Sequence, residues 1–144
     1  MTAALLLAAL LAADATRADA VDREALKKLA GKWVLTRREH GGEDADAKAI
    51  KSIRVEIDGA KMTIRDGDDV KEKTTVTLLD AKAKPASVDL EVTEGTGKGD
   101  VVKGIYKLEG GKLTICVAEP GKERPAKFEG AKGTGHTLMV LQKK

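Results

Sequence analysis

Apolar residues recur at every second position along most of the chain after residue 32, and this period constrains the fold more than any other feature. In the segment 52–57, Ile53, Val55 and Ile57 share one face of an extended chain, and the residues between them are polar. Such alternation is typical of a strand with one face in a core and the other in solvent. The pattern predicts an all-β protein.

Turn residues separate the alternating segments at short intervals. Asp58-Gly59 and the segment 109–112, Glu-Gly-Gly-Lys, are signals for tight hairpins, and Pro120-Gly121 suits a type II turn. Helical periodicity is confined to Val21–Ala30, where Asp22 is a candidate N-cap. Because no helix alternates with the strands, we expect an antiparallel barrel or sandwich rather than a parallel sheet.

The strand count and the loop lengths favour an up-and-down barrel with a mouth. The sequence indicates eight strands after one short N-terminal helix, and it allows a short ninth strand around Lys127 and Phe128. The long connections are at about 40–50, 94–100 and 119–136, and in an up-and-down meander all three fall at the same end. We therefore expect an open mouth between long loops, where binding sites usually gather.

The N-terminus has the pattern of a secretory signal peptide. An apolar run from Ala3 to Ala13, too short to span a bilayer, precedes the small-x-small sequence Ala18-Asp19-Ala20. We predict cleavage after residue 20 and a single domain over residues 21–144, located outside the cytoplasm as a secreted or periplasmic protein. No other segment of the sequence is long and apolar enough to predict an integral membrane helix.

Composition excludes several classes of function. The net charge of +3 is spread along the chain, whereas nucleic-acid binding usually requires a concentrated basic face. Cys116 is the single cysteine, so no internal disulfide can form. With one tryptophan, one tyrosine and one phenylalanine, the core must be built from aliphatic side chains.

Several short motifs resemble one family. Gly31-Lys-Trp33 on the first strand, after a short helix, resembles the lipocalin and wider calycin signature. The motifs that follow resemble an uncharacterised lipocalin-like domain family of exported planctomycete proteins: Gly97-Lys-Gly99, Gly104-Ile-Tyr106, Leu113-Thr-Ile-Cys116, Pro120–Pro125 and Gly133–His136. The resemblance spans residues 26–142 and implies a lipocalin-like barrel without assigning a function.

The same resemblance gives a role to the motif itself. We expect Trp33 to close one end of the barrel, with a hydrogen-bond partner for its indole N–H if it is buried. Better-known lipocalins place an arginine from beyond the last strand on this tryptophan. Here we expect Lys143 to lay its aliphatic stem on the indole instead.

No set of residues in the sequence predicts catalysis, a metal site or a cofactor. Cys116 and His136 could approach each other on neighbouring strands, but no third residue is evident to orient them. His40 and His136 with Asp44 and Asp46 lack the spacing of a ligand set, and solvated loop residues explain them better. We therefore predict a protein that is not an enzyme.

The leading hypothesis is a binding module for a small amphiphilic ligand at the barrel mouth. The alternative is a filled barrel that acts as a structural or interaction module of the cell envelope, with a protein partner and no ligand. An enclosed cavity of about 300 Å³ or more at the mouth would favour the first, and an interior packed solid with Ile, Val and Leu would favour the second. Candidate ligand residues at the mouth and its loops are Lys98, Tyr106, Cys116, Arg124, Phe128 and His136.

Overall fold

The structure is a computed structural model that describes residues 20–144. Apart from Ala20, the predicted signal peptide lies outside these residues. Within 20–144, no helix combines the length and the hydropathy that crossing a membrane requires.

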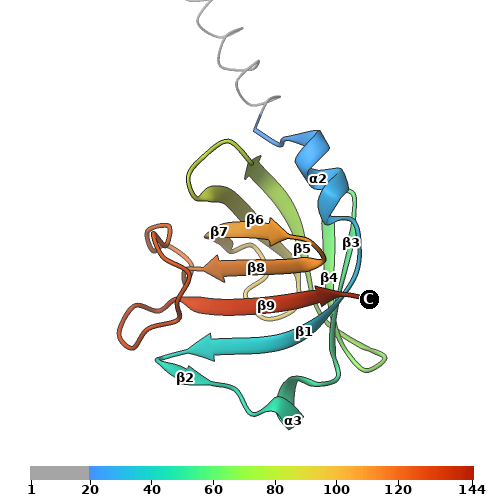
Figure 1. Ribbon diagram of the computed structural model, residues 1–144, viewed down its shortest axis with the longest axis vertical. Helices are drawn as coiled ribbons and strands as arrows, with labels where there is room; N and C mark the ends of the chain where they lie inside the picture. Colours follow the sequence, from blue (N-terminus) through green and yellow to red (C-terminus); the bar gives the residue numbers. More distant parts are fainter. Residues whose placement is uncertain (1–19) are drawn as a thin grey trace, which may run out of the picture.

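Strands dominate the described chain, as the alternation predicts (Figure 1). The strands are β1 (Gly31–His40), β2 (Glu43–Asp44), β3 (Ile53–Asp58), β4 (Lys61–Asp66), β5 (Asp69–Asp80), β6 (Ala86–Glu94), β7 (Val101–Glu109), β8 (Lys112–Val117) and β9 (Thr137–Lys143). The helices are α2 (Arg23–Leu29) and the single-turn α3 (Ala47–Ile50).

The sheet closes on itself into an eight-stranded antiparallel barrel. Neighbouring strands follow the order β1-β3-β4-β5-β6-β7-β8-β9, and β9 pairs back with β1 from Trp33 opposite Lys143 to His40 opposite Thr137. Closure leaves none of these eight strands as an unpaired edge. The predicted up-and-down barrel is therefore confirmed.

The ninth strand is not the one that the sequence allowed. Lys127 and Phe128 lie in an irregular segment, and the extra strand is β2, which pairs with the end of β1 through Glu39 opposite Asp44. α3 was also not predicted, and Asp46 caps it by accepting a hydrogen bond from the Lys48 amide at 3.0 Å. Both elements lie in the connection between β1 and β3, outside the closed barrel.

The helix α2 begins where the sequence predicts. Asp22 is its N-cap and accepts a hydrogen bond from the Ala25 amide at 3.1 Å. Leu26 and Leu29 are buried against the barrel. In Figure 1 α2 lies beside the end of the barrel where the C-terminus also ends, and we call this end the floor.

Trp33 fills the floor and joins α2 to the sheet. Its side chain is 1% exposed, and its indole N–H donates to the Leu29 carbonyl at the end of α2 over 2.9 Å. Lys143 lies over the indole, as expected, with its Nζ 5.6 Å from the centre of the ring. A Cβ on Gly31 would lie 3.2 Å from Lys143 Cε, so the missing side chain leaves room for this lysine. The Gly-x-Trp motif thus builds the floor.

The opposite end, which we call the mouth, carries the long connections. The segments 41–52, 95–100 and 118–136 all connect strands there, together with the short turn between β4 and β5. The tight turns at 59–60 and 110–111 lie at the floor. This is the asymmetry that the loop lengths predict.

Replacing Trp33 tests the floor. Trp33→Phe removes the hydrogen bond to Leu29 and leaves a gap beside Lys143, so we expect the free energy of unfolding to fall by about 1–3 kcal/mol. Urea unfolding followed by circular dichroism measures this change. Lys143→Ala is the control and should cost less than about 1 kcal/mol. Equal losses in the two variants would contradict this account of the floor.

Candidate functional site

A hollow of about 490 Å³ opens at the mouth, and it is the candidate site. Its wall is mainly aliphatic and contains no aromatic side chain. Strands from all around the barrel contribute, and the segments 41–52 and 95–100 form part of the rim. The main apolar side chains of the wall are Leu35, Ile50, Ile53, Ile64, Val92, Val102, Val117 and Met139.

A β-bulge brings Arg38 to this hollow. The pairing of β1 with β9 shifts register between Leu35 and Arg37, so Thr36 is an extra residue in the strand. Simple alternation from Trp33 would place Arg37 inside. The bulge instead turns Arg37 outward to Asp44, at 3.0 Å, and turns Arg38 to the mouth. The Arg38 side chain has no ion pair with any other residue of the described chain, 20–144.

Glu72 is the carboxylate on the apolar wall. It lies on β5 opposite Ile64 of β4, and both line the hollow. Its side chain is half-buried, and within residues 20–144 it forms neither a hydrogen bond nor an ion pair. Removal from water raises the pKa of Glu72 above its ordinary value. The mouth therefore contains a partly desolvated acid without a protein partner.

Thr74 follows Glu72 on the same inner face of β5, one pleat further along the strand. The residue is 3% exposed, and its hydroxyl has no hydrogen-bond partner among the described residues. Its cross-strand neighbour on β6, Val92, lines the hollow, whereas Thr74 itself lines a separate depression over β4, β5 and β6. A buried hydroxyl without a partner costs free energy, so this position marks a polar point that packing does not explain.

The segment 119–136, which we call the strap, reaches the rim of the mouth at Pro120 and then lies across the outer face of the barrel. Phe128 packs on a small cluster formed by Ile105, Cys116 and Leu138, which is separate from the interior core. Cys116 is fully buried beneath the strap, and its thiol donates to the Glu129 carbonyl at 3.5 Å. Burial raises the pKa of the Cys116 thiol. Cys116 therefore does not line the mouth.

Two anchors hold the strap. Arg124 donates to the carbonyls of Val88 on β6 and Gly104 on β7, at 3.2 and 2.8 Å, and lies 2.8 Å from the Asp89 carboxylate. Gly130 donates its amide to the Glu39 carboxylate at 2.6 Å. The structure thus gives Arg124 a role in fixing the loop.

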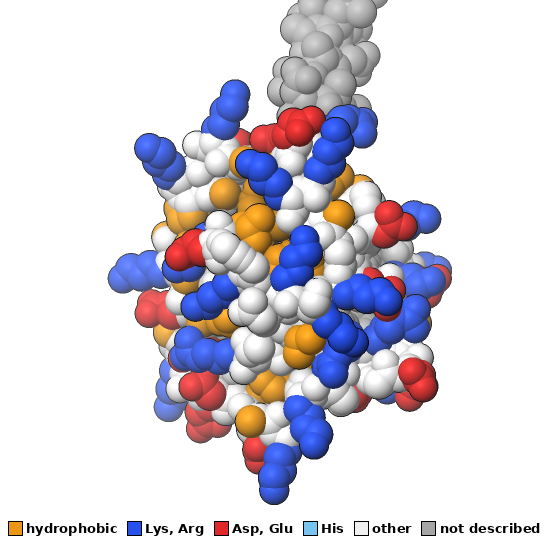
Figure 2. All heavy atoms as spheres, turned by 45° about the vertical axis from the view of Figure 1, so that its right-hand side comes forward, with side chains coloured by type: hydrophobic (Ala, Val, Ile, Leu, Met, Phe, Trp, Pro, Cys, Tyr) orange, Lys and Arg blue, Asp and Glu red, His pale blue; other side chains and the backbone are white. Residues whose placement is uncertain are grey.

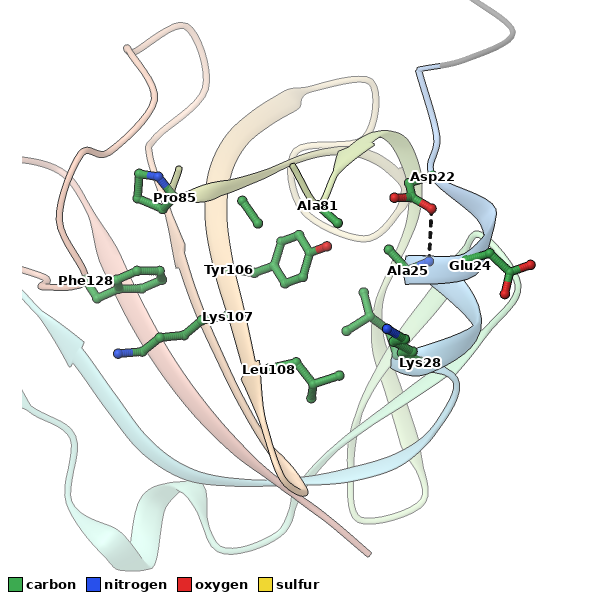
Figure 3. Close-up of a pocket in the computed structure, with 12 residues that line it drawn as sticks. Asp22, Glu24, Ala25, Lys28, Ala81, Pro85, Tyr106, Lys107, Leu108 and Phe128 are labelled. Carbon is green, nitrogen blue, oxygen red and sulfur yellow. Dashed lines mark hydrogen bonds between the residues drawn. The ribbon is translucent and has the colours of Figure 1, made fainter. Parts of the chain in front are cut away.

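Tyr106 and Phe128 line a second hollow, of about 480 Å³, on the floor side of the molecule (Figure 3). The tyrosine ring lies between β7 and α2, while Phe128 and Lys107 lie on the other side of the hollow, 4.8 Å apart from Nζ to ring centre. Removal from water raises the pKa of Tyr106, and the negative charges of Asp22 and Asp80 raise it further. Figure 2 shows apolar side chains on this side of the molecule, surrounded by lysine and arginine side chains.

The six candidate ligand residues are therefore not gathered at one site. Lys98 is exposed on the rim loop beside the mouth, and His136 is half-buried where the strap meets β9. Within residues 20–144, no three His, Cys, Asp or Glu side chains converge as metal ligands would. Sequence reasoning missed the polar residues that do line the mouth.

Comparison of the chain with protein-family models, with curated proteins and with solved structures gives no match. The class to which the protein belongs is therefore defined by its architecture. It is a closed antiparallel β-barrel with a packed floor and a hollow, mainly aliphatic mouth.

Gly130 allows a first test of the strap. A Cβ there would collide with the backbone carbonyl group of Glu39, and the backbone of Gly130 does not have a positive φ. We expect Gly130→Ala to lower the free energy of unfolding by about 1–3 kcal/mol because the strap must move off β1. Gly111→Ala is the control in urea unfolding, since its Cβ would meet the flexible end of Gln142. A stability equal to that of the control would refute the close contact.

Glu72 predicts a dependence of stability on pH. Since its pKa is raised in the folded state, folding favours the protonated form. Its contribution to stability is full below the unfolded pKa and is lost as pH rises through the raised folded value. The stability of Glu72→Gln relative to the wild type should therefore increase with pH across this range, as measured by urea unfolding at several pH values. A pH-independent difference would contradict the desolvation of Glu72.

Proposed function

We propose that this protein is an exported binding module whose barrel mouth holds a small amphiphilic ligand, without catalysis. The observation that supports this most directly is the hollow at the mouth. It is open to solvent rather than enclosed, and its volume of about 490 Å³ lies in the range of ligand sites, about 300–1,000 Å³. Its aliphatic wall suits an alkyl chain, and its few polar groups suit one polar end.

The lower half of the barrel limits how deep such a ligand can reach. Trp33, Leu113 and Leu141 fill the interior towards the floor and are almost completely buried. A ligand therefore inserts its apolar part into the upper half only. The polar end stays in the mouth, where the charged side chains of Arg38, Glu72 and Asp100 lie.

Export and family membership belong to the same proposal. The signal-like pattern of residues 1–20 supports a secreted or periplasmic location, and the Gly-x-Trp floor supports a lipocalin-like relationship. The alternative, an interaction module of the cell envelope, is favoured by the second apolar hollow on the floor side, which a protein partner could cover.

Two matched substitutions distinguish these functions. Ala49 and Ala81 are both exposed, but Ala49 lines the mouth and Ala81 lines the floor-side hollow. We expect 1-octanol, a neutral amphiphile, to bind the wild type in calorimetric titration. Because an indole at position 49 fills the mouth, Ala49→Trp should weaken binding at least about tenfold, and Ala81→Trp should leave it unchanged.

The opposite pattern, with loss in Ala81→Trp only, would move the ligand to the floor side and refute the mouth. No binding to the wild type would refute the carrier function and favour the envelope module.

A further inference from the structure

Three charged side chains line the mouth, and they differ in how far each is removed from water. Arg38 and Asp100 are exposed at the rim, so solvent can satisfy both. Glu72 is half-buried on the aliphatic wall. A charged group that is partly desolvated and has no partner costs free energy. A ligand that supplies the partner therefore gains more binding free energy at Glu72 than at the rim.

We propose that the mouth selects amphiphiles with a protonated amine, and that the ammonium group of the ligand pairs with Glu72 while its alkyl chain packs on the aliphatic wall. This inference rests on the proposed function, because it assigns the polar end of the ligand that the mouth binds.

The net charge of the lining favours a cation over an anion. Glu72 and Asp100 carry two negative charges against the single positive charge of Arg38. An anionic ligand would have to pair with Arg38 at the exposed rim, where ion pairs contribute little, and would leave Glu72 unpaired. A cation instead compensates the carboxylate that burial destabilises.

The chemistry of the acceptor sets the class of amine. The Glu72 carboxylate accepts hydrogen bonds, and a primary ammonium group has three N–H donors. Because no aromatic side chain lines the mouth, the aromatic cage that recognises quaternary ammonium groups is missing from the lining. The site therefore suits a primary amine, whose N–H groups can donate hydrogen bonds to Glu72.

The test compares three ligands with the same chain and different polar ends: octylamine, 1-octanol and octanoate. Calorimetric titrations at pH 7 keep the amine protonated and the carboxylate ionised. We expect octylamine to bind about tenfold more tightly than 1-octanol, the change in affinity typical of one hydrogen bond to a charged group. Octanoate should bind no more tightly than 1-octanol.

Variants locate the selectivity within the mouth. Glu72→Gln keeps the size of the side chain and should abolish the preference for octylamine while 1-octanol still binds. Glu91→Gln is the matched control, because Glu91 lies on the adjacent strand β6 opposite Thr75 and outside the mouth lining. It should leave all three affinities unchanged. Thr74→Val should also leave the three affinities unchanged, because Thr74 lies outside the lining of the mouth.

The outcomes distinguish a failure of amine selection from a failure of the proposed binding function. Equal affinities for all three ligands, or a preference for octanoate that Arg38→Gln abolishes, would overturn amine selection and leave a mouth that binds amphiphiles. A preference for octylamine that survives in Glu72→Gln would also overturn it. Failure of all three ligands to bind would refute the proposed function itself.

Discussion

Pairing between β1 and β9 closes the sheet, and the interior of this protein exists because of that pairing. The backbone groups of both strands find partners in each other, so alternate side chains of eight strands converge on one enclosed space. At one end of the pairing, Trp33 lies opposite Lys143, and these residues build the floor with the end of α2. At the other end, His40 lies opposite Thr137 at the mouth.

The same pairing contains the irregularity that gives the mouth its chemistry. The extra residue at Thr36 reverses the faces of β1 beyond that point, so Arg38 faces the mouth and Arg37 pairs with Asp44 outside. On β5, alternation places Glu72 on the inner face, where it lines the mouth. The charged groups of the mouth thus come from β1, β5 and the segment 95–100, while aliphatic side chains occupy the wall between them.

The strap explains why several residues with reactive or basic side chains have structural roles. Arg124 donates hydrogen bonds to two backbone carbonyls of the barrel. Cys116 is buried beneath the strap, where the Phe128 side chain packs on it. A long loop at the mouth end therefore extends down the outside of β7, β8 and β9 instead of closing the entrance. The segments 41–52 and 95–100 border the entrance, together with Pro120 at the start of the strap.

The resemblance to the lipocalin signature predicts the Gly31–Trp33 floor. The pattern of residues alone predicts the all-β class, the helix capped by Asp22 and the end at which the long loops gather. These features follow from local rules, namely side-chain period, turn chemistry and capping, which act within a few residues. Counting every second residue back from the buried Val76 along β5 also predicts that Glu72 faces the interior. The bulge at Thr36, the path of the strap and the short strand β2 depend on contacts between distant residues, such as Glu39 with Gly130. Only the closed barrel brings such residues together, so local pattern cannot predict that Arg38, rather than Arg37, faces the mouth.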